Sequence, residues 1–212
     1  MKSCSPFRAK SSGNCSSIKS NKSHSAKSLK DLVKIYIESQ KKSVATSQCL
    51  SVVLAHYRGM NSLEDVIKSA AFAKTSEGKR HSHQYRIRKS AMVYAEKFIE
   101  AEIKKGTTFR SFEDLHQWFS GKCSNKKASR GKGLGPLYVY DTCLRIGAYL
   151  KLEPDHIYLH AGALTGARAL LGVVKSNKLM LQDLPSVLHS LKPYEIEDFL
   201  CIYKKELSKF KH

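Results

Sequence analysis

The chain is short of acidic residues. Its 212 residues include 18 Asp and Glu against 37 Lys and Arg, which gives a formal net charge of +19 at pH 7. Pairing on the surface cannot neutralise such a surplus, so the exterior carries a positive field that attracts polyanions. We expect nucleic acid as the partner, with DNA favoured over RNA and an anionic membrane surface as a weaker alternative.

Long apolar runs are missing as well. No run approaches the roughly 18 apolar residues that a membrane span needs, and residues 1–30 lack the apolar core of a secretory signal. We therefore expect an intracellular protein, cytoplasmic or in the nucleoid or nucleus, without a transmembrane segment. Nothing in the sequence indicates an oligomeric state.

Motifs for metals and nucleotides are absent too. The six cysteines lie far apart without a Cys-x-x-Cys, whereas iron–sulfur clusters and four-cysteine zinc sites need closely spaced ligands. The chain has no P-loop and no Gly-x-Gly-x-x-Gly after a strand. His81 and His83 have no third ligand close by in the sequence, so we expect neither a metal nor a cofactor.

The N-terminal segment differs in composition from the rest of the chain. Its first 30 residues contain ten Ser, seven Lys or Arg and no Asp or Glu, and almost nothing that a core could bury. This composition predicts a disordered basic arm over residues 1–28. A tether that contacts phosphates, an organelle-targeting peptide and a solubilising tail are the alternatives for its role.

Helical periodicity runs through residues 29–212, and a two-residue alternation persists nowhere. We expect a single all-α domain with one core, because a chain of this length hardly holds two. Helices are predicted from Leu29, over 46–57, from Ser62, over 84–105, from Ser111, from Pro136, and around 154–160, 161–175, 182–191 and 193–210. A short strand at 156–160 is the alternative to the helix there.

The loop between residues 120 and 135 is the most informative local feature. It carries five basic residues and no acidic one: Lys122, Lys126, Lys127, Arg130 and Lys132. The glycines of Gly133-Leu134-Gly135 bring backbone N–H groups near a ligand, and the helix that follows adds the positive end of its dipole. The segment predicts a phosphate site, with a turn that needs glycine only for its conformation as the alternative.

Residues 131–160 resemble the helix-hairpin-helix DNA-binding motif, since Gly133-Leu134-Gly135 precedes a helix as in that motif; the hairpin element would span 131–150. The resemblance extends distantly to the helix-hairpin-helix DNA glycosylase superfamily, whose catalytic aspartate corresponds to Asp155. Leu137 occupies the position of the Schiff-base lysine, so the resemblance implies an enzyme without lyase activity. The alternative is that Asp155, after a proline, caps the start of a helix.

A second basic segment spans residues 74–89. Five of its side chains are candidates for phosphate contacts: Lys79, Arg80, Arg86, Arg88 and Lys89. Gln84 or Tyr85 could approach a base by hydrogen bonding or stacking. His81 and His83, within this segment, could act in acid–base cleavage of a phosphodiester.

Three function classes follow from these patterns. The favoured one is a nucleic-acid-binding protein that contacts the DNA backbone without sequence specificity through the glycine hairpin and the basic loops. The first alternative is a base-excision DNA glycosylase that uses Asp155 as its catalytic residue. The second is a protein-interaction module for an acidic partner, with Trp118 and Phe119 as anchors.

Overall fold

The computed structural model describes residues 26–42, 47, 49–124 and 134–211. The predicted all-α fold is confirmed. Its α-helices are α1 (Leu29–Lys42), α2 (Leu50–Arg58), α3 (Leu63–Ala71), α4 (Lys89–Lys104), α5 (Phe112–Ser124), α6 (Pro136–Leu150), α7 (Ala161–Leu171) and α8 (Pro193–Ile202). Short 3-10 helices are η4 (Ser82–Gln84), η5 (Leu181–Asp183), η6 (Ser186–Ser190) and η7 (Leu207–Phe210). Of the predicted arm at 1–28, only residues 26–28 are among those described.

Several helix ends lie where the local sequence predicts them. The Ser62 hydroxyl accepts a hydrogen bond from the Asp65 amide at 3.1 Å before α3, and Ser111 does the same for Asp114 before α5. Such side-chain caps satisfy amides that have no partner within the helix. Gly106 follows α4 with φ +80°, the left-handed region that glycine adopts without strain. Pro136 is the first residue of α6, where its missing N–H costs nothing.

Four predicted helices are corrected. The segment around 182–191 forms the 3-10 helices η5 and η6, and in the segment 193–210 α8 ends at Ile202 and η7 follows. The segment around 154–160 is not helical but contains strand β1 (Ile157–Tyr158), which pairs antiparallel with β2 (Lys178–Leu179), so the strand alternative is right. Both β1 residues are buried, and the pairing with β2 satisfies backbone groups that burial removes from water. The helix predicted over 84–105 begins only at Lys89, because the chain first forms the 3-10 turn η4.

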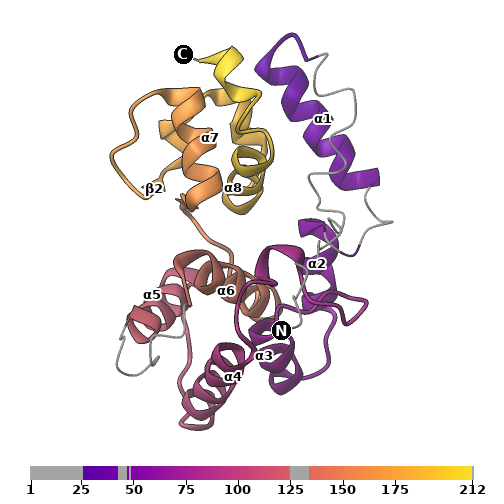
Figure 1. The fold of residues 1–212 in the computed structure, drawn as a ribbon, viewed down its shortest axis with the longest axis vertical. Coiled ribbons are helices and arrows are strands. Elements are labelled where there is room, and N and C mark those ends of the chain that lie inside the picture. Colours follow the sequence, from indigo (N-terminus) through magenta and orange to yellow (C-terminus); the bar gives the residue numbers. More distant parts are fainter. Residues whose placement is uncertain (1–25, 43–46, 48, 125–133, 212) are drawn as a thin grey trace, which may run out of the picture.

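The helices pack around two hydrophobic clusters, whereas the sequence predicts one core. In Figure 1, α2 to α6 form one group, and α1, α7 and α8 form another with the short strands. The first cluster fills the group of α2 to α6, and the second fills the other group. Tyr158 from β1 and Tyr194 from α8 belong to the first cluster, so aromatic side chains cross from one group to the other.

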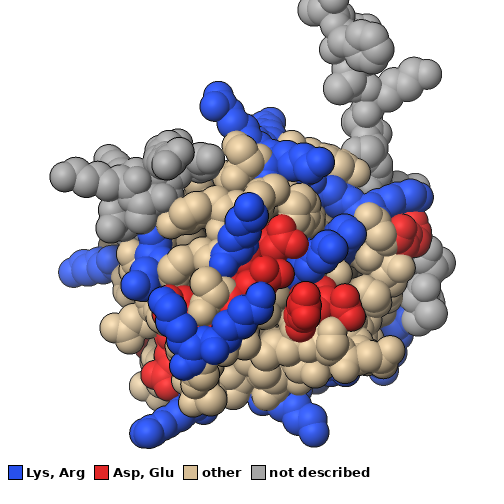
Figure 2. Space-filling view, turned by 90° about the horizontal axis from the view of Figure 1, so that it is seen from below, with Lys and Arg blue, Asp and Glu red and all other residues tan. Residues whose placement is uncertain are grey.

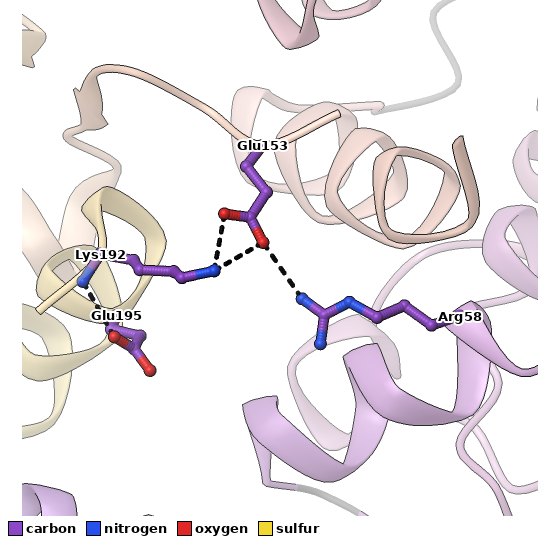
Figure 3. Close-up of polar contacts among 4 residues, drawn as sticks. All are labelled: Arg58, Glu153, Lys192 and Glu195. Atoms are coloured by element: carbon purple, nitrogen blue, oxygen red, sulfur yellow. Dashed lines mark hydrogen bonds and ion pairs between the residues drawn. The ribbon is translucent and has the colours of Figure 1, made fainter. Parts of the chain in front are cut away.

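The interface between the two groups also contains ion pairs. The Glu153 carboxylate accepts hydrogen bonds from Lys192 Nζ at 2.8 and 2.9 Å and from Arg58 Nη2 at 3.3 Å (Figure 3). Arg58 ends α2, Glu153 follows α6 and Lys192 precedes α8. One carboxylate therefore links three segments that are distant in sequence.

Close helix packing in the second group depends on a small residue. Gly166 of α7 lies so near α8 that a Cβ atom there would clash with the Leu200 carbonyl oxygen. Gly166 thus allows α7 and α8 to pack closely. In the described part of the chain, no helix combines the length and apolar character that crossing a membrane requires.

Candidate nucleic-acid interface

The N-terminal end of α6 is the centre of the predicted phosphate site. Leu134 is buried and anchors the chain just before the helix, while Gly135 is exposed at the N-cap and has no side chain to cap the helix. The first N–H groups of a helix have no partner within it, and its dipole favours an anion there. Gly135 has φ −74°, and a Cβ atom there would meet nothing within 4 Å. Neither the backbone conformation nor a close contact therefore requires glycine at this position.

A pocket of about 560 Å³ lies at this end of the helix. Its lining includes Gly135 and Leu137 from the start of α6, His116 from α5, His160 and Lys178. Burial lowers the pKa of His116 to about 4, with Lys178 and His160 nearby, and it also lowers the pKa of His160. Both rings are neutral at pH 7, so Lys178 is the one cation among the described residues that line this pocket; its Nζ lies 4.6 Å from the centre of the Tyr158 ring.

The second basic segment begins with a small hairpin. Lys74 and Arg80 form an isolated antiparallel bridge, and the Thr75 amide donates to the Lys79 carbonyl at 2.8 Å. Lys79 is exposed at the turn and pairs with Glu77 at 2.9 Å. Arg80 is half-buried and donates from Nη1 to the Ile87 carbonyl at 3.2 Å. Arg80 therefore supports the segment, and Lys79 is the more accessible of the two for a phosphate.

The start of α4 presents a group of exposed side chains. Arg86, Arg88 and Lys89 are exposed, and 51% of Tyr85 is accessible to solvent. Arg88 is the N-cap residue, and the first turn of the helix contains no acidic residue. Cations at a helix N-terminus are unfavourable without an anion to balance them. The Tyr85 ring is exposed, and its stacking on a base stays a prediction.

Gln84 joins this segment to α6. Its side chain is 1% exposed, and its Nε2 donates to Asp141 Oδ2 at 2.6 Å. The prediction that Gln84 approaches a base is therefore wrong, because burial against α6 removes its amide from the surface. The same hydrogen bond fixes the second basic segment beside the first turns of α6.

A small cavity of about 90 Å³ is lined by residues of both the second basic segment and α6. His81 and His83 line it together with Leu137, and Leu137 also lines the larger pocket. The two histidine rings lie edge to face with centroids 5.2 Å apart. The structure thus brings the second basic segment and the hairpin end of α6, which are far apart in sequence, to one region of the surface.

Five residues of the predicted phosphate site fall outside the described residues: Lys126, Lys127, Arg130, Lys132 and Gly133. Lys122, which precedes them, is exposed near the end of α5 with its Nζ 5.8 Å from the centre of the Phe98 ring. The helix α5 extends to Ser124, whereas the sequence predicts its end near Phe119. The connection to α6 is accordingly shorter than expected.

The face at the α4 end carries both basic and acidic side chains. Figure 2 views the molecule from the α4 end and shows Lys and Arg side chains spread over this face, with Asp and Glu gathered among them. A uniform positive patch is therefore not present on this face. The suggested anchors for a protein partner are also mostly covered, since Phe119 is buried and Trp118 stacks on Phe98 with centroids 5.1 Å apart.

The small cavity also contains polar side chains that sequence reasoning did not assign to a site. Arg145 is 4% exposed; its Nη2 lies 3.8 Å from Asp141 Oδ2, and its Nη1 has no hydrogen-bond partner among the described residues. Glu197 and Asp198 from α8 complete the acidic side, and burial raises the pKa of both, that of Asp198 to about 7. The spacing of Asp141 and Arg145 within α6 predicts their pairing. Only the tertiary structure shows that acidic residues of α8 line the same cavity.

Asp155 lies on the surface in the loop between α6 and β1. Its side chain is 66% exposed and forms a hydrogen bond with His156 Nδ1. Burial opposes its ionisation, but hydrogen bonds to Glu113 and His156 outweigh this and lower its pKa. The capping alternative is wrong, because no helix starts at Asp155. Asp155 lines neither of the two pockets beside α6.

The same loop contains the one group of potential metal ligands found in the described part of the chain. The ligand atoms of Glu113, Asp155 and His156 all lie within 4.8 Å of one another. Glu113 comes from the first turn of α5, so this group is invisible in the local sequence around Asp155.

No family model, curated protein or solved structure matches this chain.

Proposed function

We propose that this chain binds nucleic acid through phosphate contacts at the N-terminal end of α6 and the neighbouring basic segment at 79–89. The observation that carries the proposal is the Gln84–Asp141 hydrogen bond, which holds that segment against α6. Two stretches singled out separately for phosphate contacts therefore border the same end of one helix. The net charge of +19 supplies the long-range attraction.

The contacts divide into two kinds. Backbone amides at the start of α6 and the cations Lys79, Arg86, Arg88 and Lys89 would hold phosphates, which carry no sequence information. The exposed Tyr85 ring would stack on an unpaired base, an interaction that tolerates any base. Binding without sequence specificity follows from both, and DNA is the form that the hairpin resemblance favours.

The test is a salt series with a short fluorescent duplex, followed by anisotropy. The triple variant Arg86→Ala, Arg88→Ala and Lys89→Ala removes three exposed cations at the start of α4. We expect it to weaken binding to all duplex sequences alike. A matched control removes the same charge elsewhere, by Lys205→Ala, Lys209→Ala and Lys211→Ala. These exposed residues lie near the C-terminus, at the end of the molecule opposite α4 (Figure 1).

Equal loss of affinity in both triple variants would mean that the total charge, and not this surface, determines binding. Loss only in the variant at 86–89 supports the proposed interface. Absence of duplex binding by the wild-type chain at low salt would refute the proposal outright.

A base-excision enzyme is the second candidate, and one observation favours it. Asp155 is exposed with a lowered pKa, so it is ionised at pH 7 as a residue that stabilises a cationic sugar must be. The test uses Asp155→Asn with duplexes that carry damaged or mismatched bases. Base release by the wild type, lost in the variant while duplex binding persists, would support catalysis. Absence of base release by the wild type from such duplexes would remove this candidate.

A further inference from the structure

Three side chains from two distant segments converge beside the start of α5. Glu113 lies in the first turn of that helix, and Asp155 and His156 lie in the loop before β1. His156 Nδ1 contacts Asp155 Oδ1 and lies 3.7 Å from Glu113 Oε1. One imidazole nitrogen thus faces two carboxylates.

The negative charges of Glu113 and Asp155 are not paired with lysine or arginine in the described part of the chain. Within the described ranges, no Lys or Arg nitrogen lies within 4 Å of either carboxylate, and His156 is their only ion-pair partner. Glu153 in the same loop differs, because Arg58 and Lys192 both contact it (Figure 3). Two carboxylates in contact repel each other unless a proton or a cation lies between them. A bound cation would remove this repulsion.

We propose that Glu113, Asp155 and His156 bind a divalent transition-metal ion, with Zn²⁺ as the best fit. Imidazole together with carboxylates suits zinc and its neighbours, whereas magnesium and calcium prefer oxygen ligands alone. Bonds of 2.0–2.2 Å in a tetrahedral site place ligand atoms about 3.4 Å apart, close to the 3.7 Å between His156 and Glu113. The three ligand atoms all lie within 4.8 Å of one another, and His156 Nδ1 would have to move away from Asp155 Oδ1 for both to bind one ion.

The surroundings of the three residues support the same assignment. The Tyr158 hydroxyl donates to Glu113 Oε1 at 3.4 Å, the kind of outer contact that orients a ligating carboxylate. Asp155 faces solvent, which leaves a fourth position open to water. Sequence spacing predicts no metal here because Glu113 is brought in only by the fold. The site does not depend on nucleic-acid binding.

The test is a Zn²⁺ titration of the full-length chain after treatment with a chelator, with bound metal measured by elemental analysis and affinity by calorimetry. We expect one zinc equivalent that His156→Ala and Glu113→Gln both lose. Tyr158→Phe should retain the metal with affinity about 10- to 100-fold lower, the usual effect of losing an outer contact. Co²⁺ in the same site should give the absorption bands of a coordinated ion in the wild type and not in His156→Ala.

Two control variants separate this site from other metal-binding groups. Glu153→Gln changes a carboxylate of the same loop that pairs with lysine and arginine, and it should leave zinc binding intact. His83→Ala removes an exposed histidine elsewhere and should do the same. Circular dichroism checks that each variant is folded. Equal zinc affinity of the wild type and His156→Ala, or loss of zinc only in His83→Ala, would overturn the assignment.

Discussion

Replacing Gly135 by Ala separates the fold from the proposed phosphate contact. The residue has φ −74° and ψ 170°, which alanine adopts readily, and the added Cβ would meet nothing within 4 Å. Alanine is a poorer N-cap residue than glycine, but it also lowers the entropy of the unfolded chain by an amount worth about 0.4–1 kcal/mol. These effects oppose each other, so the free energy of unfolding should change by less than about 0.5 kcal/mol.

Binding should respond much more strongly. Gly135 lines the pocket at the start of α6, so the new methyl group would stand where a phosphate approaches the amides. A hydrogen bond to a charged group contributes about 1.5–3 kcal/mol, and its loss weakens affinity by roughly 10- to 100-fold. Anisotropy with a duplex and thermal unfolding of the same preparations provide the two readouts.

Gly106→Ala is the matched control. Gly106 has φ +80°, so alanine there strains the backbone and lowers the melting temperature. Because Gly106 lies after α4 and lines neither of the two pockets beside α6, duplex affinity of the folded protein should stay unchanged. If Gly135→Ala left both the melting temperature and the affinity unchanged, the amides at the start of α6 would not be the phosphate contact.

Three further predictions concern single side chains. Tyr85→Ala should weaken binding of single-stranded DNA by about 1–3 kcal/mol without changing stability, as measured by anisotropy and thermal melting; unchanged affinity would exclude stacking on this ring. Gly166→Ala should destabilise the fold by about 1–3 kcal/mol in urea unfolding, because the methyl group clashes with α8; wild-type stability would contradict the close packing. Burial raises the pKa of Asp198 to about 7 from 3.8 in the unfolded chain. The free energy of unfolding should therefore fall as the pH rises from 4 to 7. Asp198→Asn should remove on the order of 4 kcal/mol of that fall, and an unchanged pH profile would refute the raised pKa.

The helical framework was predictable because it depends on local rules. Ser62, Ser111, Gly106 and Pro136 mark helix ends through capping, a left-handed residue and a missing N–H, all of which the sequence shows directly. The apolar stripes identified the buried faces. The division into two hydrophobic clusters was not visible, since each stripe indicates burial but not the helix against which it packs.

The strand at Ile157–Tyr158 shows the limit of local reasoning. Two buried apolar residues suit a strand or a helix equally well, and the partner that decides is β2, which lies beyond α7 in the chain. The start of α4 was misjudged for a related reason. Gln84 belongs to the helical pattern by sequence, but its side chain is held by Asp141 in a turn that precedes the helix.

The candidate sites were predictable in part. Basic segments and the glycine hairpin stand out in the sequence, and exposure agrees with a surface role for Arg86, Arg88 and Lys89. Their arrangement around one end of α6 required the fold. The meeting of Glu113 with Asp155 and His156 was invisible, because no spacing rule links the start of one helix to a loop after the next.

The salt dependence of duplex affinity tests the central claim most directly. Contacts from the four proposed cations (Lys79, Arg86, Arg88 and Lys89) would give a slope of log K against log salt of about −4. We expect that slope for the wild type and a slope shallower by about 3 for the variant that lacks the cations at 86, 88 and 89. An affinity that does not change with salt, or equal slopes for the two proteins, would contradict it.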